Sequence, residues 1–363
     1  MDGAAPDALV QDALERQAAS CRHLGSELYG SLLEGLAADH RRGGITCELL
    51  RGASTRPVHD ALPLRLLGAV HRLALEGHAP EVARHYPSCD GDTRLGDPTG
   101  PVLAAMREHA PAIRAALATQ VQTNEPARAV AIATGLSHVT RTTRLPLHTL
   151  EIGASAGLVS RWPHYRLDDG HSATGPPDAD LRFGPEWFET SARLEPSITV
   201  LSRRASDVAP MQPENDEHAT RLLSFLWPDQ TDRIDRLRRA LGIAAADPLD
   251  VEQADAGEWL GRLLAAPPVE ASATVVFHSI VWQYLSEPTR HRIHTAFSTA
   301  ARWATPERPV AWVRMEPATA EHADIRVTIW PTGEERVVAM VGYHGRGLRW
   351  TAPTSGGAGR QPS

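Results

Sequence analysis

The stretch His148–Trp162, HTLEIGASAGLVSRW, constrains the fold of this chain more than any other part of it. The apolar run Leu145–Ile152 has the length of a buried strand and carries a carboxylate, Glu151, near its end. Five small residues, Gly153–Gly157, follow, and after them apolar side chains recur at helical spacing. The pattern predicts a buried strand, a glycine-rich corner and a helix.

Such a corner has three interpretations. A turn without side chains lets a ligand approach the backbone, and the first N–H groups of a helix would face that ligand, as in dinucleotide-binding folds and S-adenosylmethionine (SAM) methyltransferases. The letters Gly153-x-Ser155-x-Gly157 also match the nucleophile elbow of α/β-hydrolases, with Ser155 as the attacking residue. In the third interpretation the small residues serve only the packing of a tight corner.

Composition limits the partners. The chain has 363 residues, 42% of them hydrophobic, which is enough for two domains with a substantial core. Because the net charge is -7 and neither end carries a Lys/Arg block, we expect neither nucleic acid nor an anionic membrane as a partner. The N-terminus lacks the pattern of a signal peptide, and no apolar run approaches the roughly 18 residues of a membrane span. We therefore expect a cytoplasmic protein.

No metal site is expected from the spacing of ligand residues. Cys21, Cys47 and Cys89 are far apart in the sequence and form no C-x-x-C pair, so they predict neither a disulfide framework nor a zinc site. His291 and His294 have i, i+3 spacing, but no third ligand stands near them in the sequence. The oligomeric state stays open.

The first part of the chain is predicted to be helical. Apolar side chains recur at helical spacing over residues 8–39, 61–75 and 102–117, and no segment before residue 145 has the pattern of a strand. We therefore expect an all-helical N-terminal or cap domain over residues 1–140. A hydrolase elbow normally follows several strands of its sheet, whereas this corner follows the first, which argues against the hydrolase. A triad in the correct chain order can still be written: Ser155, Asp255 or Asp324, and His344.

The second part alternates short apolar strands with helices. The clearest strands are residues 197–201, 273–277 and 310–314, and two late alternating runs flank a turn at Pro331. This order predicts an α/β fold with a Rossmann-like, doubly wound parallel sheet over residues 141–350, of the SAM-methyltransferase type because it ends in a β-hairpin. Residues 351–363 should form a disordered tail.

The second strand departs from the usual nucleotide-binding pattern. In such folds this strand ends in an acid that holds the ribose hydroxyls, about 20 residues beyond the glycines. Here arginines, Arg203 and Arg204, follow the predicted strand, and Asp207 comes a few residues late. The arginines could instead form salt bridges or meet an anionic substrate.

The chain also resembles a family of bacterial proteins, domain-of-unknown-function family 2332, over nearly its whole length. The similarity is carried by Val70–Leu75, Val121–Glu125, Leu150–Leu158, Trp227–Gln230 with Arg233, Val275–Ser279, and His344-Gly345 with Trp350. The resemblance implies a Rossmann-like fold of the SAM-dependent methyltransferase superfamily and no particular activity. Family members tend to have an Asn where this chain has Val159, and an Asp before Arg-Tyr where it has Pro163-His164-Tyr165. If that Asp serves substrate or cofactor in relatives, this chain lacks it.

In the methyltransferase interpretation SAM lies across the corner. The carboxylate of Glu151 would face the ammonium group of SAM, and the corner amides would face its carboxylate. Asp255, which follows the predicted third strand, would accept a hydrogen bond from the adenine amino group. The expected cofactor-binding residues are Glu151, Gly153, Ala154, Ser155, Gly157, Asp255 and Ala256.

Polar residues elsewhere are candidates for the methyl acceptor. His278 and Ser279 follow the fourth strand, where the acceptor usually enters, and His278 is the candidate base, although a buried histidine bonded to backbone is an equal alternative. Gln122, Asn124 and Glu125 are candidate substrate contacts or, equally, the end of a helix before a turn.

Three functions follow. The first is a SAM-dependent methyltransferase acting on a small-molecule acceptor. The second is a SAM- or nucleotide-binding regulatory protein that has kept the fold without catalysis, an alternative favoured by the missing acid after the second strand. The third is the α/β-hydrolase with Ser155 as nucleophile.

Overall fold

The computed structural model describes residues 4–351. Most of the predicted tail, the part beyond Thr351, lies outside the described residues. The chain divides into two compact units. One contains the chain up to Thr123 together with Glu214–Arg238, and the other contains Asn124–Pro213 and the chain from Arg239 onward. None of the helices within residues 4–351 is both long and apolar enough to cross a bilayer.

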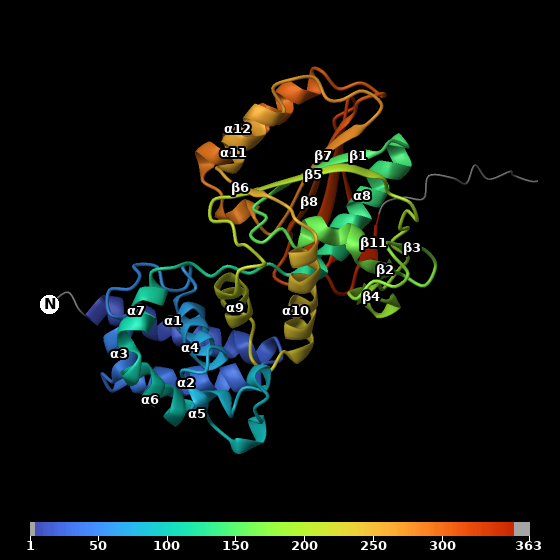
Figure 1. Ribbon diagram of the computed structural model, residues 1–363. Coiled ribbons are helices and arrows are strands. Elements are labelled where there is room, and N and C mark those ends of the chain that lie inside the picture. The colour runs from blue at the N-terminus through green and yellow to red at the C-terminus, as the bar shows by residue number, and fades with distance from the viewer. Residues whose placement is uncertain (1–3, 352–363) are drawn as a thin grey trace, which may run out of the picture. The chain divides into compact units, whose positions relative to one another are not determined.

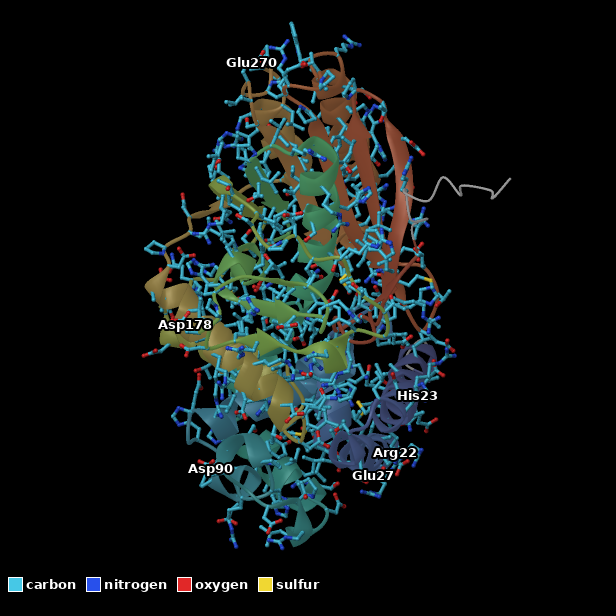
Figure 2. The ribbon with its side chains drawn as sticks, turned by 90° about the vertical axis from the view of Figure 1, so that its right-hand side faces the viewer. Arg22, His23, Glu27, Asp90, Asp178 and Glu270 are labelled. Carbon is cyan, nitrogen blue, oxygen red and sulfur yellow. The ribbon has the colours of Figure 1, made fainter. Side chains whose placement is uncertain are left out.

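The first unit is built from helices (Figure 1). They are α1 (Ala4–His23), α2 (Glu27–Arg41), α3 (Ile45–Leu50), α4 (Leu62–Leu75), α5 (Pro80–Ala83), α6 (Thr99–Glu108), α7 (Ala110–Leu117), α9 (Asp216–Ser224) and the first part of α10 (Thr231–Ala246), with short 3-10 turns η1 (Pro87–Cys89) and η2 (Thr93–Leu95). Helix α2 begins at an N-cap, Ser26, whose hydroxyl accepts the N–H of Tyr29 at 3.2 Å. Its Leu32, Leu33 and Leu36 are fully buried in the core of this unit. At the α1–α2 connection Arg22 pairs with Glu27 at 2.9 Å (Figure 2).

The second unit contains the strands. Its elements are η3 (Pro126–Arg128), α8 (Ala129–Thr143), β1 (Leu147–Ile152), η4 (Val159–His164), β2 (Arg166–Asp168), β3 (Ala173–Thr174), β4 (Arg182–Phe183), η5 (Pro185–Trp187), β5 (Val200–Asp207), β6 (Val251–Gln253), α11 (Ala256–Leu263), β7 (Ala273–Ser279), η6 (Trp282–Tyr284), α12 (Glu287–Ala301), β8 (Val310–Pro317), β9 (Ala323–Trp330), β10 (Glu334–Val341) and β11 (Arg349–Trp350). The predicted mixed α/β class is confirmed. Between the corner and β5 the chain forms β2, β3 and β4, which make a small separate sheet.

Eight strands form the main sheet in the order β11-β10-β9-β8-β7-β1-β5-β6. The pairs from β6 to β8 are parallel, and the pairs from β8 to β11 are antiparallel. β9 and β10 form a hairpin at the turn that the sequence predicts, and it extends the sheet beyond β8. β1 lies between β5 and β7, so the strand order reverses at the first strand of the sheet.

Helices cover both faces of this sheet. On one face Leu150 and Val276 pack with Trp259 of α11 and Phe297 of α12 in a buried cluster. On the other face α8 approaches so closely that a Cβ at Gly135 would lie 2.4 Å from a methyl group of Val313. Side chains alternate between the faces along each strand, which is why neighbouring core residues serve different helices. Figure 1 shows α11 and α12 side by side over the strands.

Two elements differ from the sequence-based expectation. The segment after the corner is a six-residue 3-10 helix, η4, rather than an α-helix, and Pro163 lies inside it. Proline removes a backbone donor, which disfavours continuation as an α-helix. β5 runs to Asp207, so Arg203 and Arg204 lie within the strand and the acid ends it. Both arginines are paired, with Asp247 and Glu252 respectively, which explains why a strand tolerates them.

Candidate functional site

The corner after β1 is shaped by residues with positive φ. The φ angles are 66° at Gly153, 53° at Ser155 and 67° at Gly157. Ile280, which follows the neighbouring strand β7, has φ 54°, and a β-branched residue there is a genuine outlier. Such strain costs about 1–3 kcal/mol per residue and is concentrated at functional sites. The adjacent carboxyl ends of β1 and β7 are therefore the candidate functional site.

The chain itself satisfies several amides of this corner. The N–H of Ala154 donates to the carbonyl of Ser206 at 3.1 Å, and that of Ser155 donates to Asp207 Oδ2 at 2.8 Å. The N–H of Gly157 donates to the carbonyl of Ala154 at 2.7 Å. Because no α-helix begins here, the corner also lacks the helix N-terminus that an anionic group would use. The expected row of bare amides is not present at these three residues.

Side chains of the protein fill the space beside both glycines. A Cβ at Gly153 would lie 2.6 Å and 2.7 Å from the methyl groups of Val281, which follows β7. A Cβ at Gly157 would lie 2.9 Å from Arg161 Nη1 and 3.1 Å from a methyl group of Leu249. The close contacts that these glycines permit are therefore made with other side chains of the same protein.

Glu151 lies inside the unit. Its side chain accepts a hydrogen bond from the hydroxyl of Ser160, and the residue is 2% exposed. Burial raises the pKa of Glu151 to about 8, and the hydrogen bonds from Ser160 offset only part of that effect. The raised pKa favours the neutral form of this carboxyl group, whereas the role expected for it, facing an ammonium group, requires a charge.

A buried arginine fixes the shape of the corner. Arg161 Nη1 donates to the carbonyls of Ala156 and Gly157, both at 2.9 Å. Its Nη2 donates to the carbonyls of Ala244 at 3.3 Å and Asp247 at 3.0 Å. The guanidinium thus joins the corner to the end of α10. Sequence reasoning missed this residue, because an arginine after a turn carries no signal of burial.

Asp207 is the acid that the sequence analysis placed a few residues beyond the end of the predicted second strand. As the last residue of β5, it lies at the carboxyl edge of the sheet beside the corner. Its Oδ2 accepts the N–H of Ser155, and its Oδ1 accepts the N–H of Ala209 at 2.9 Å. The side chain is half-buried. A carboxylate thus stands at the carboxyl end of the strand beside β1.

Asp255 is the N-cap of α11. It accepts the N–H groups of Gly257 and Glu258, the hydroxyl of Thr289 at 2.6 Å, and Arg292 Nη2 at 3.2 Å. Burial alone would raise the pKa of Asp255, but these hydrogen bonds and the arginine keep it below its usual value. Its neighbour Ala256 is buried as the first residue of the helix. Both residues follow β6 at the carboxyl edge, and the carboxylate already has several partners.

His278 is fully buried and belongs to a dyad with Glu316 at the end of β8. Its Nδ1 lies 2.6 Å from Glu316 Oε1, which also accepts the N–H groups of Val281 and Trp282. The His278 ring stacks on that of Trp282, with centroids 5.8 Å apart. Burial alone would raise the pKa of Glu316, but its contacts with His278 keep it below its usual value. Since Nδ1 donates to the carboxylate, the lone pair lies on Nε2, which is buried and has no hydrogen-bond partner within residues 4–351.

One of the three expected substrate residues before α8 contacts the corner directly. Asn124 Oδ1 accepts the N–H of Leu158 at 2.9 Å, although the two residues are 34 positions apart. Glu125 is buried and caps the short helix η3. Gln122 belongs to the other compact unit. Ser279 is 8% exposed, and its carbonyl accepts a long hydrogen bond, 3.4 Å, from Arg128.

The hydrolase triad finds little support in this geometry. Ser155 is 4% exposed, and its hydroxyl has no hydrogen-bond partner among the described residues. A nucleophilic serine needs a base within hydrogen-bond reach. Asp255 is engaged at α11, and Asp324 pairs with Arg326 at 2.7 Å.

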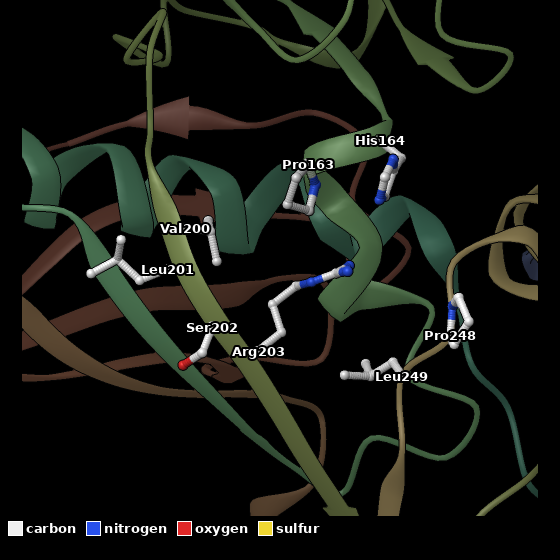
Figure 3. A pocket seen from close by; sticks show the side chains of 8 residues that line it. All are labelled: Pro163, His164, Val200, Leu201, Ser202, Arg203, Pro248 and Leu249. Atoms are coloured by element: carbon white, nitrogen blue, oxygen red, sulfur yellow. The ribbon is translucent and has the colours of Figure 1, made fainter.

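A pocket lies beside the amino-terminal half of β5, and one of its lining residues, Leu249, also lies beside Gly157 of the corner. Figure 3 shows its lining, and its volume is about 390 Å³. The lining residues are Pro163, His164, Val200, Leu201, Ser202, Arg203, Pro248 and Leu249. Arg203 makes a bidentate pair with Asp247, at 2.6 Å and 2.7 Å, so its charge is already neutralised.

Comparison with known proteins places the chain in a family. No curated protein and no solved structure matches it. One family model, described as "Uncharacterized protein conserved in bacteria (DUF2332)", matches residues 11–350. Because this match spans nearly the whole chain, the protein belongs to the DUF2332 family.

Proposed function

We propose that the protein binds SAM at the carboxyl edge of its main sheet and transfers the methyl group to a small-molecule acceptor. The observation that carries this proposal is the position of Asp207. It ends the strand next to β1 and bonds directly to the β1 corner at the point where the strand order reverses.

The strand order supports a nucleotide-like ligand. In chain order the parallel strands β6-β5-β1-β7-β8 read 3-2-1-4-5, which is the arrangement of doubly wound nucleotide-binding sheets. In open α/β sheets ligands bind outside the carboxyl ends of the strands, where the order reverses. Here that point lies between β1 and β7, at Gly153 and Val281.

The charge pattern favours SAM over a dinucleotide. A pyrophosphate is normally bound by free amides at the start of an α-helix. At this corner Ala154, Ser155 and Gly157 have internal partners, and the following helix is a short 3-10 turn. SAM has no phosphate; its only anionic group is the methionine carboxylate, and it also carries a sulfonium and an ammonium group. It therefore depends less on such a site than a pyrophosphate does, and the Asp207 carboxylate suits its ribose or a cation.

Two buried hydroxyls beside Asp207 fit a polar ligand. Ser155 Oγ and Ser206 Oγ are both buried without a hydrogen-bond partner within residues 4–351. Buried polar groups are normally satisfied, and an exception calls for an explanation such as a ligand or a water molecule. Ser155 follows β1, and Ser206 lies near the carboxyl end of β5, so both hydroxyls belong to the carboxyl edge of the sheet.

His278 is the proposed base for the methyl acceptor. Glu316 holds Nδ1–H, so Nε2 can take the proton that the acceptor loses as it attacks the methyl group. When bound, SAM supplies an electrophilic methyl carbon on its sulfonium. The protein supplies orientation and the proton acceptor.

A second candidate is a SAM-binding protein without turnover. The full burial of His278 and the tight contact between Gly153 and Val281 favour it, because both limit the access of an acceptor. It shares the ligand site with the first proposal and differs only in the chemistry.

Calorimetric titration of the purified protein with SAM, S-adenosylhomocysteine and NAD tests the ligand site. We expect SAM and S-adenosylhomocysteine to bind and NAD not to bind. Asp207→Asn should weaken SAM binding by about 10- to 100-fold, because a charge-assisted hydrogen bond contributes about 1.5–3 kcal/mol. Asp178→Asn, at an exposed position of the same unit (Figure 2), should bind as the wild type does. Absence of SAM binding would refute the proposal.

Methyl transfer is tested separately with SAM labelled on the methyl group. The protein is incubated with a small-molecule extract, and labelled products are separated by chromatography. The methyltransferase predicts a labelled product that the His278→Gln variant forms more slowly while still binding SAM. SAM binding with no labelled product would favour the second candidate.

A further inference from the structure

The helical unit brings together three metal-ligating side chains that are distant in the sequence. They are Asp7 in the first turn of α1, His40 in the last turn of α2 and Cys47 in α3. One ligand atom of each lies within 4.8 Å of the others. We propose that these residues bind a single Zn²⁺-class transition-metal ion. The site is distinct from the SAM site proposed above.

The ligand set matches the chemistry of zinc. Zn²⁺ binds cysteine sulfur, histidine nitrogen and aspartate oxygen, usually with four ligands in a tetrahedron. An aspartate, a cysteine thiolate and a neutral histidine together carry a charge of -2, which neutralises a divalent ion. Three protein ligands leave one position for a water molecule, as in many zinc sites. The thiolate also disfavours Mg²⁺ and Ca²⁺, which prefer oxygen ligands.

A hydrogen-bond chain orients the histidine for metal binding. Gln11 Nε2 donates to Glu15 Oε1 at 2.6 Å, which turns its carbonyl oxygen toward His40. Gln11 Oε1 lies 3.0 Å from His40 Nδ1, so Nδ1 carries the proton and Nε2 carries the lone pair. Glu15 is in turn held by Arg41 Nη1 at 2.7 Å. A metal-bound histidine almost always donates its other N–H in this manner.

The burial of the ligands gives independent support. His40 is 6% exposed and Cys47 is 7% exposed, whereas Asp7 is more accessible. Within residues 4–351 His40 Nε2 has no hydrogen-bond partner. Over the same part of the chain, Cys47 Sγ has only a weak contact, 3.7 Å from Arg51 Nη2. Two metal-ligating side chains that lie in buried residues and have so few partners are available to a metal ion.

The turn that carries two of the ligands is fixed before any metal binds. Asp39 Oδ2 accepts the N–H of Thr46 at 2.9 Å, which ties the end of α2 to the start of α3. Gly44 packs against the same carboxylate, where a Cβ would lie 2.1 Å from Asp39 Oδ1. His40 and Cys47 are therefore held in place, and metal binding would join them to the beginning of α1.

Cobalt substitution tests the site directly in the full-length protein. After treatment with a chelator, the protein is titrated with Co²⁺ and followed by absorption, because a thiolate ligand gives a sulfur-to-cobalt charge-transfer band. We expect one Co²⁺ per chain, displaced by Zn²⁺. Cys47→Ser should abolish the band, and Cys89→Ser, a cysteine of the same unit outside the cluster, should leave it unchanged. Gln11→Met should weaken binding by about 10- to 100-fold while the band persists.

Alkylation of the wild-type protein gives a second test that needs no variant. Zn²⁺ should slow the reaction of Cys47 with iodoacetamide and leave the rate at Cys89 unchanged, as followed by mass spectrometry. No charge-transfer band together with no protection of Cys47 would overturn the proposal. A band that depends on Cys89 rather than Cys47 would overturn it as well.

Discussion

Replacing Gly153 by alanine tests whether the corner is shaped by internal packing. A left-handed backbone costs a non-glycine residue about 1–2 kcal/mol. The new Cβ would also lie 2.6 Å and 2.7 Å from the methyl groups of Val281, and such overpacking costs about 1–3 kcal/mol. We therefore expect Gly153→Ala to lower the free energy of unfolding by about 2–5 kcal/mol. Urea denaturation followed by circular dichroism measures this loss.

Gly170→Ala is the matched control. Gly170 lies in the same unit with φ 83°, but its Cβ would meet only Pro185 at 3.6–3.7 Å, an ordinary contact, so its loss should be about 1–2 kcal/mol. Adding Val281→Ala to Gly153→Ala removes both methyl groups and leaves only a Cβ at 3.2 Å. The double variant should recover about 1–2 kcal/mol relative to additivity. Equal losses at the two glycines, with no such recovery, would refute the packing argument.

Three further predictions concern buried polar groups. The pKa of Glu151 is about 8 in the folded protein and 4.5 in the unfolded chain, so the unfolded state releases its proton first and wild-type stability is lost as pH rises through this interval. The stability of Glu151→Gln relative to wild type should therefore increase by up to about 1.4 kcal/mol per pH unit between pH 5 and 8. Parallel pH profiles of the two proteins in urea unfolding would contradict this. Glu316→Ala removes the acceptor of three donors, one of them the buried His278 Nδ1, and should cost about 2–4 kcal/mol in thermal or urea unfolding. Glu316→Gln, which keeps an oxygen, should cost less, and equal costs would show that the hydrogen bonds do not matter. Arg161→Met leaves buried carbonyls of the corner without a donor and should cost about 3 kcal/mol or more, an expectation that a near-wild-type unfolding midpoint would exclude.

Local sequence pattern was sufficient for much of the fold. The apolar run before Gly153 and the run Ala273–Phe277 are strands because short apolar segments between turn residues bury both faces of a parallel sheet. The late hairpin was visible from its turn at Pro331. In contrast, β5 was predicted to end before Arg203, because the ion pairs that allow arginines inside a strand come from residues more than forty positions away.

The candidate sites depend on contacts that sequence spacing does not encode. The hydrogen bond from Leu158 to Asn124 and that from Ser155 to Asp207 each join residues separated by more than thirty positions. Asp7 and Cys47 are also more than thirty positions apart, so their spacing in the sequence gave no sign that their ligand atoms lie close together. One weak signal was available, since Glu151 lies near the end of the first predicted strand and Asp207 follows the second.

Ultraviolet crosslinking of radiolabelled SAM to the full-length protein tests the proposed ligand site most directly. Trypsin cuts after Arg203 and Arg204, so the peptide that begins at Ala205 and contains Asp207 separates from the peptide that ends at Arg203, which carries Val200–Arg203 of the pocket lining in Figure 3. We predict label in the Asp207 peptide or in the peptide that carries Gly153–Leu158, and loss of that label with excess unlabelled SAM. Label confined to the peptide ending at Arg203, or no label that unlabelled SAM displaces, would contradict SAM binding at the carboxyl edge.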